Sequence, residues 1–198
     1  MILINRTTQI LLNPKREWQV IAAEPSSTGA LYTHVILPLA AIGPVATLIG
    51  WSVFGISIPF AGTYRVPLSA SLESALVRYV LGLVAVFVLA LIIDGLAPTF
   101  GGQKSQVQAL KVAAFSSTAA WLAGIFGLIP ALSVLGIVGA YSLYLLYAGL
   151  PIVMKAPPDR ALGYTVVVIL CAVVLFFLIG VVTARFVVTP GSMGIPAT

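Results

Sequence analysis

Asp94 is the acidic side chain of this chain whose place is hardest to explain as ordinary surface. It directly follows 15 uncharged residues, numbers 79 to 93, which form the apolar middle of a predicted membrane span. A carboxylate near the hydrocarbon edge is costly unless it is paired, and its short side chain reaches water less easily than lysine or arginine. We therefore expect Asp94 to pair with Lys104, Lys155 or backbone N–H groups. It either anchors a helix end or belongs to a binding site.

Residues typical of catalysis are sparse. The chain has one histidine, His34, and one cysteine, Cys171. It has no His/Cys cluster at metal-ligand spacing, no paired carboxylates, no nucleophile elbow and no phosphate loop. We expect His34 at a membrane interface and Cys171 in a core or facing lipid. The sequence predicts a protein that is not an enzyme and that needs neither a metal nor another cofactor.

A tyrosine-rich helix is the second feature that could carry function. The stretch 141–165 reads YSLYLLYAGLPIVMKAPPDRALGYT. At 100° per residue, one arc gathers small and aromatic side chains and the opposite arc gathers leucines. We expect the first arc to pack inward, because buried tyrosine hydroxyls find partners inside a bundle, and we expect Pro151 to end the helix. The predicted inward residues are Ser133, Gly136, Ala140, Tyr144 and Tyr147, and the predicted outward residues are Leu135, Leu143, Leu146 and Leu150.

Composition decides the class of protein. Of 198 residues, 60% are hydrophobic and 8% are charged, whereas about a quarter of the residues of a soluble domain are charged. The sequence therefore predicts an all-α, polytopic integral membrane protein whose first partner is the lipid bilayer. The net charge of +5 comes without basic patches that alternate with aromatic residues, so no nucleic-acid partner is expected. We expect the chain to insert through its uncleaved spans, without a cleavable signal peptide.

Five spans are expected. Residues 1–32 form a cytoplasmic N-terminal segment, with an amphipathic helix that begins at Asn13-Pro14 and ends near Glu24. This helix either lies in the interface, with Trp18 among the headgroups, or packs under the bundle. Residues 33–187 form the membrane domain, and 188–198 a short non-cytoplasmic tail. The predicted spans are about 34–54, 71–96, 112–128, 131–152 and 161–184.

Glycine and proline mark the breaks between and within these spans. Gly43-Pro44 predicts a kink, residues 55–70 a loop, and the run from Gly127 to Pro130 a tight helical hairpin. The first arm of that hairpin needs either Lys111 to snorkel or the helix to sit shallow. Small residues repeat every fourth position along this arm, which favours close approach of helix backbones; they are Ser116, Ala120 and Gly124.

The distribution of basic residues predicts the orientation. With a cytoplasmic N-terminus, seven of the ten basic residues lie inside and three lie outside, which favours N-inside and C-outside. Two helix exits, 94–104 and 151–160, then meet at the cytoplasmic face. The candidate binding or packing site consists of Asp94, Pro98, Gly101, Gly102, Tyr144, Tyr147, Pro151 and Lys155.

Several motifs resemble the prokaryotic branch of the Yip-one (Ypt-interacting protein) membrane family. They are NPKREW at 13–18, LAPTFGG at 96–102, SST at 116–118, YSLYLLYAGLP at 141–151 and GYT at 163–165. The resemblance implies a five-helix membrane domain with a cytoplasmic N-terminus. The acidic-Leu-Tyr-Gly-Pro motif of the eukaryotic members is absent, so their binding of Rab-type GTPases is not carried over. Ala119 stands where the prokaryotic branch often has a helix-bending proline.

Two functions remain open on the sequence. The first is a non-enzymatic membrane-organisation or helper protein of the prokaryotic inner membrane, which binds partner membrane proteins or lipids at its cytoplasmic face. The alternative is a small channel or transporter for an ion or solute, because broken helices and a carboxylate near the hydrocarbon edge are typical of transporters. A chain of this size would then need to form a homo-oligomer.

Overall fold

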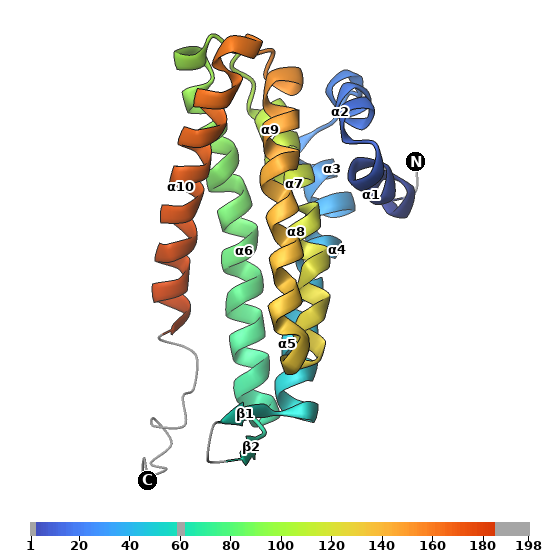
Figure 1. Cartoon of the computed structure of the whole chain (residues 1–198), viewed down its shortest axis with the longest axis vertical. Helices are drawn as coiled ribbons and strands as arrows, with labels where there is room; N and C mark the ends of the chain where they lie inside the picture. Colours follow the sequence, from blue (N-terminus) through green and yellow to red (C-terminus); the bar gives the residue numbers. More distant parts are fainter. Residues whose placement is uncertain (1–2, 59–61, 185–198) are drawn as a thin grey trace.

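The computed structural model describes residues 3–58 and 62–184 (Figure 1). The predicted tail 188–198 and the end of the membrane domain at 185–187 lie outside the described residues. Five helical segments are long and apolar enough to cross a membrane: Thr28–Phe54, Leu68–Leu96, Gln106–Leu128, Pro130–Val153 and Pro158–Thr183. The prediction of an all-α, five-span membrane protein is confirmed.

Two short helices precede the first span. α1 (Leu3–Leu12) was not predicted, whereas α2 (Pro14–Ala23) begins at the predicted Asn13-Pro14 pair. Proline suits this first position because its missing N–H would have no partner inside the helix. Both helices lie beside the upper part of the bundle in Figure 1.

Trp18 on α2 lies in the core. Its side chain is fully buried, and its ring meets Phe115 edge to face at 6.4 Å between centroids. A Cβ added at Gly149 would lie 2.6 Å from the indole, so the missing side chain of Gly149 makes room for Trp18. The expectation that Trp18 lies among lipid headgroups is therefore wrong, and the alternative, a helix packed against the bundle, holds.

The first span is built from short pieces. It runs through α3 (Thr28–Leu31), the π-helical η1 (Tyr32–Ile36), α4 (Leu37–Ala40), α5 (Ile42–Ile49) and the π-helical η2 (Gly50–Phe54). The α-helix is interrupted at Ala41, close to the kink predicted from Gly43-Pro44. Because Pro44 has no N–H, it cannot bond the carbonyl of Ala40 four residues earlier.

A β-hairpin follows where the sequence predicts a loop. β1 (Ile56–Ile58) pairs antiparallel with β2 (Gly62–Tyr64), with Ile56 opposite Tyr64 and Ile58 opposite Gly62. The hairpin lies at the end of the bundle opposite α2 (Figure 1). α6 (Leu68–Leu96) then crosses the bundle without a break.

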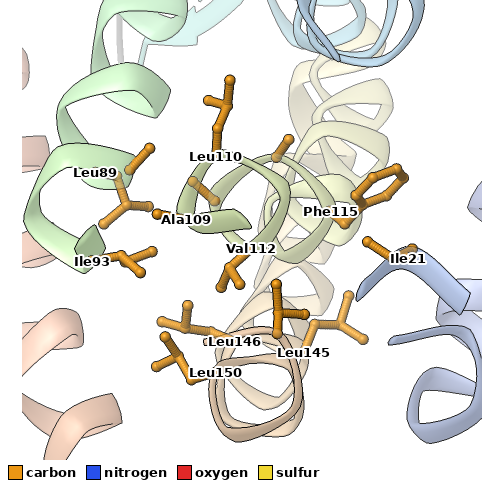
Figure 2. Close-up of a cluster of buried hydrophobic side chains, with 14 of the residues drawn as sticks. Ile21, Leu89, Ile93, Ala109, Leu110, Val112, Phe115, Leu145, Leu146 and Leu150 are labelled. Atoms are coloured by element: carbon orange, nitrogen blue, oxygen red, sulfur yellow. The ribbon is translucent and has the colours of Figure 1, made fainter. Parts of the chain in front are cut away.

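The third span occupies the centre of the bundle. It consists of α7 (Gln106–Ser116), α8 (Thr118–Ala123) and the 3₁₀-helical η4 (Gly124–Leu128). Figure 2 shows side chains of α7 lying between those of α6, α9 (Tyr141–Val153) and α2. This core includes Ile21, Leu89, Ile93, Leu110, Val112, Phe115, Leu145, Leu146 and Leu150.

The predicted helical hairpin is present. Ile129, in an extended conformation, separates η4 from η5 (Pro130–Ala140), an eleven-residue 3₁₀ segment that continues into α9. The small-residue pattern also has its predicted effect, since a Cβ on Gly124 would lie 2.7 Å from the Cα of Gly43. Only glycine allows α5 and η4 to approach so closely.

The inward face of α9 differs from the predicted one, although Leu143 is exposed as predicted. Tyr144 and Tyr147 are 42% and 45% exposed, whereas Leu146 and Leu150 are buried. In an apolar solvent nothing drives leucines outward, so packing geometry decides which face turns in. The recess at Gly149 that receives Trp18 lies on the leucine side. Pro151 lies inside α9, two residues before its end at Val153, and does not terminate the helix.

Candidate functional site

The two helix exits expected to form a site do meet. After α6 the chain makes a short 3₁₀ turn, η3 (Pro98–Phe100), and α10 (Pro158–Ala184) follows α9 after a short connection. The backbone N–H of Gln103 donates to the carbonyl of Met154 at 2.8 Å. This hydrogen bond ties the α6–α7 connection to the α9–α10 connection. We call this region the exit junction; it comprises residues 94–104 and 151–160.

Two glycines let the connections touch. Gly101 has φ +73°, in the left-handed region, and a Cβ there would lie 3.2 Å from the ring of Pro157. A Cβ at Gly102 would lie 3.0 Å from the carbonyl oxygen of Met154. Phe100 stacks on Tyr164 with ring centroids 5.1 Å apart. The exit junction is therefore tightly packed around these contacts.

Asp94 is buried in this junction without the predicted partner. It is 8% exposed, and its Oδ1 has no hydrogen-bond partner in the described part of the chain. No ion pair among residues 3–58 and 62–184 joins it to Lys104 or Lys155, so the predicted pairing with these two lysines is wrong. Both lysines are exposed to solvent, whereas Asp94 lies on the buried side of α6. Beside it, the Tyr164 hydroxyl donates to the carbonyl of Ile93.

The predicted site residues fall into two groups. Asp94, Pro98, Gly101, Gly102 and Lys155 lie in the exit junction, where Pro98 and Lys155 are exposed. Lys155 has φ 53°, which places the turn out of α9 at this residue. Tyr144 and Tyr147 lie on the outer face of α9, and Pro151 is within the helix. The structure therefore does not gather all eight residues into one pocket.

A cavity that sequence reasoning missed lies under the N-terminal helices. It has a volume of about 330 Å³ and is bounded by α1, α2, the α2–α3 connection, the start of the first span and α7. Its charged lining comes from Arg6, Glu24 and Lys111, and His34 also borders it. Its apolar lining includes Leu3, Ile21, Leu31, Val35 and Phe115. We call it the N-terminal cavity.

Lys111 is the most buried charged group of this cavity, at 2% exposure. Its Nζ donates to the carbonyls of Ile21 at 2.8 Å and Glu24 at 2.5 Å. These carbonyls belong to the C-terminal end of α2, where no intrahelical N–H is left to bond them. Gln108 adds a bond from Nε2 to the carbonyl of Ala22 at 3.1 Å. Lys111 therefore caps α2 from within the bundle and does not snorkel to an interface.

Arg6 fixes α1 to the same helix. Arg6 is 8% exposed, and its guanidinium bonds the carboxylate of Glu24 through Nη2. Its Nη1 lies 3.1 Å from Oε1 of Glu17, at an angle that makes this contact an ion pair and not a hydrogen bond. Arg6 thus pairs with both Glu17 and Glu24, and Lys111 adjoins this charged cluster through the backbone carbonyl of Glu24.

The sequence held a partial signal for this cluster. Glu17 and Glu24 are seven residues apart, which places them on the face of α2 that also carries the apolar Ile21. Acidic residues on an apolar face need buried basic partners. Nothing local identifies Arg6 as such a partner, because it comes from another segment of the chain.

Residues 8–180 match the family model described as the Yip1 domain. The chain belongs to the Yip1 family. This match confirms the resemblance drawn from the sequence motifs. The matched region begins within α1 and ends in the last turns of α10. Leu3 and Arg6, which line the N-terminal cavity, lie before its start.

Relatives of the chain are bacterial membrane proteins. It is similar to "Inner membrane protein YohC" of Escherichia coli strain K12, with 25% identity over 157 residues that cover 77% of this chain and 80% of the relative. The protein of the same name from Escherichia coli O6:H1 strain CFT073 gives the same values. No solved structure matches the chain significantly.

Proposed function

We propose that this Yip1-family protein is a non-enzymatic helper of membrane organisation in the prokaryotic inner membrane. It binds partner membrane proteins or lipids through the end of the bundle that carries the exit junction and α2. This end faces the cytoplasm. The inner-membrane relative and the motif resemblance support the location, and the scarcity of catalytic residue types in the sequence supports binding over catalysis.

The observation that carries the proposal is the charge of this end of the bundle. Exposed basic side chains lie on α2, on the α6–α7 connection and around the start of α10, which Figure 1 shows at the same end. They are Lys15, Arg16, Lys104, Lys155 and Arg160. Asp159 is exposed among them, and Glu24 is engaged by Arg6. Such a surface attracts anionic lipid headgroups and acidic segments of partners, and it is typical of cytoplasmic loops.

The test is site-directed cross-linking in native membranes. A photo-reactive amino acid replaces Lys155 at the exit junction, and in a matched control it replaces Arg65, which is exposed beside the β-hairpin at the other end. We expect position 155 to give a reproducible adduct with a defined membrane protein or lipid that position 65 does not give. The same adducts from both positions would contradict a binding face at the exit junction.

Flux measurements separate this proposal from transport. The purified protein is reconstituted in vesicles loaded with ions or small solutes. A helper protein gives no flux above that of empty vesicles. Saturable flux would overturn the proposal in favour of a channel or transporter.

A further inference from the structure

The ammonium group of Lys111 lacks an anionic partner. Its two hydrogen bonds go to neutral backbone carbonyls, and no ion pair to it occurs in the described part of the chain. An ammonium has three N–H donors, so one remains. Lys111 lines the N-terminal cavity, and a cation at 2% exposure with no carboxylate at ion-pair distance is costly. An anionic oxygen in the cavity would remove that cost.

The charge of the cluster also constrains what the cavity accepts. The formal charges of Arg6, Lys111, Glu17 and Glu24 sum to zero, although Arg6 alone is ion-paired with the two carboxylates. Glu24 uses Oε2 for Arg6, and its side chain is 48% exposed, which leaves the rest of the carboxylate available to a further donor. A ligand with one negative and one positive group matches this arrangement. A purely anionic ligand would be repelled by the carboxylate of Glu24 and would have no positive group to offset this repulsion.

The cavity also has an apolar lining, so it suits a ligand that carries an apolar part beside its charged groups. Leu3, Leu31 and Val35 border the same space as the charged groups. On the outer side of α1, Ile4 is 72% exposed and Leu12 is 70% exposed. Such outward apolar residues suit a helix at the boundary of headgroups and acyl chains, where a cavity under α1 would open at headgroup depth. A volume of about 330 Å³ is within the usual range for ligand pockets, about 300–1,000 Å³.

We propose that the N-terminal cavity binds the headgroup of a zwitterionic phospholipid. The phosphate accepts the remaining N–H of Lys111, the amine donates to the carboxylate of Glu24, and the start of the acyl region contacts Leu3, Leu31 and Val35. This inference rests on the proposed function, because it names the lipid that the same end of the protein binds. It is a separate site from the exposed basic surface, since its charged groups are mostly buried.

Lipid retention by the full chain tests the site. Purified protein is equilibrated with equal amounts of phosphatidylethanolamine and phosphatidylglycerol, and native mass spectrometry counts the lipids that stay bound. We expect the wild type to retain phosphatidylethanolamine preferentially. Lys111→Gln keeps an N–H donor for α2 but removes the charge, and it should weaken retention about tenfold, the size of one lost charge-assisted hydrogen bond. Glu24→Gln should reduce the preference for phosphatidylethanolamine.

Gln108→Leu is the matched control. It removes a bond from α7 to α2 at the same place but leaves the cation of Lys111 untouched. Its lipid retention should equal that of the wild type. If Lys111→Gln and Gln108→Leu retain equal amounts of lipid, or if the wild type prefers phosphatidylglycerol, the proposed site is refuted. Soluble glycerophosphoethanolamine should compete weakly; competition as strong as that of the whole lipid would refute a lipid site in favour of a site for a free phosphate ester.

This experiment is separable from the cross-linking at position 155. If position 155 gives adducts but lipid retention does not depend on Lys111, the cavity site is refuted and the binding face is supported. Lys111-dependent retention without adducts at 155 refutes the binding face and supports the cavity site. Thermal unfolding of each variant in detergent confirms that the compared proteins are folded.

Discussion

At the scale of single residues, the packing of α2 depends on one large side chain and one missing side chain. Trp18 enters the recess at Gly149, where even a methyl group would overlap its ring. Sequence reasoning recognised α2 and offered burial as one of two placements for Trp18. It could not choose between them, because the recess lies about 130 residues away in the chain, and a glycine within a helix has no sequence signature of what packs on it.

Gly149→Ala tests this contact. The new methyl group must displace the indole, so we expect a loss of about 1–3 kcal/mol in the free energy of unfolding, the usual cost of overpacking. Thermal unfolding in detergent, followed by tryptophan fluorescence, measures it. Gly82→Ala on α6 is the control, because nothing lies within 4 Å of the added Cβ, and it should be neutral or stabilising. Equal behaviour of the two variants would contradict the packing of Trp18 on Gly149.

At the scale of elements, the five spans and their breaks were predictable because their signals are local. Uncharged runs of helix length, the Gly127–Pro130 break and the repeat through Gly124 all act within a few turns of helix. The 3₁₀ geometry of η5 and the inward side of α9 were not predictable. Both depend on neighbouring helices, and hydrophobicity does not distinguish the lipid side from the bundle side.

The attachment of α1 to α2 is also a property of elements. In the described part of the chain, Arg6 on α1 forms ion pairs with Glu17 and Glu24. Glu17 is 6% exposed. The charges lie on segments that are separate in sequence. Local patterns therefore identify each residue as charged but not as part of one cluster.

Arg6→Met should release α1. The change leaves the buried carboxylate of Glu17 without its cation, and breaking a buried pair on one side costs about 3–5 kcal/mol. We expect local opening, with faster hydrogen exchange and proteolysis in residues 3–12, while the spans stay protected. Lys15→Met is the control, since Lys15 is exposed. Unchanged protection of α1 in Arg6→Met would show that the cluster does not hold this helix.

At the scale of the whole molecule, the distribution of basic residues predicts that the α6–α7 and α9–α10 connections lie at the same end of the bundle. In the structure these connections touch through the hydrogen bond from Gln103 to Met154. The expected pairing inside that site failed, because Asp94 faces the packed junction while its supposed partners face water. The N-terminal cavity escaped prediction altogether, since four separate segments build it. The meeting of the two connections was thus more predictable than the contacts inside the site.

We expect the basic end of the bundle to be the cytoplasmic binding face, and cysteine labelling can determine on which side of the membrane it lies. In a Cys171→Ala background, Lys155→Cys and Arg65→Cys are exposed to a membrane-impermeant maleimide on intact bacterial cells. If the basic end is cytoplasmic, Arg65→Cys is labelled on intact cells and Lys155→Cys only after the membrane is opened. Labelling of Lys155→Cys on intact cells, with Arg65→Cys protected, would place the basic end outside the cytoplasm and refute the proposed binding face.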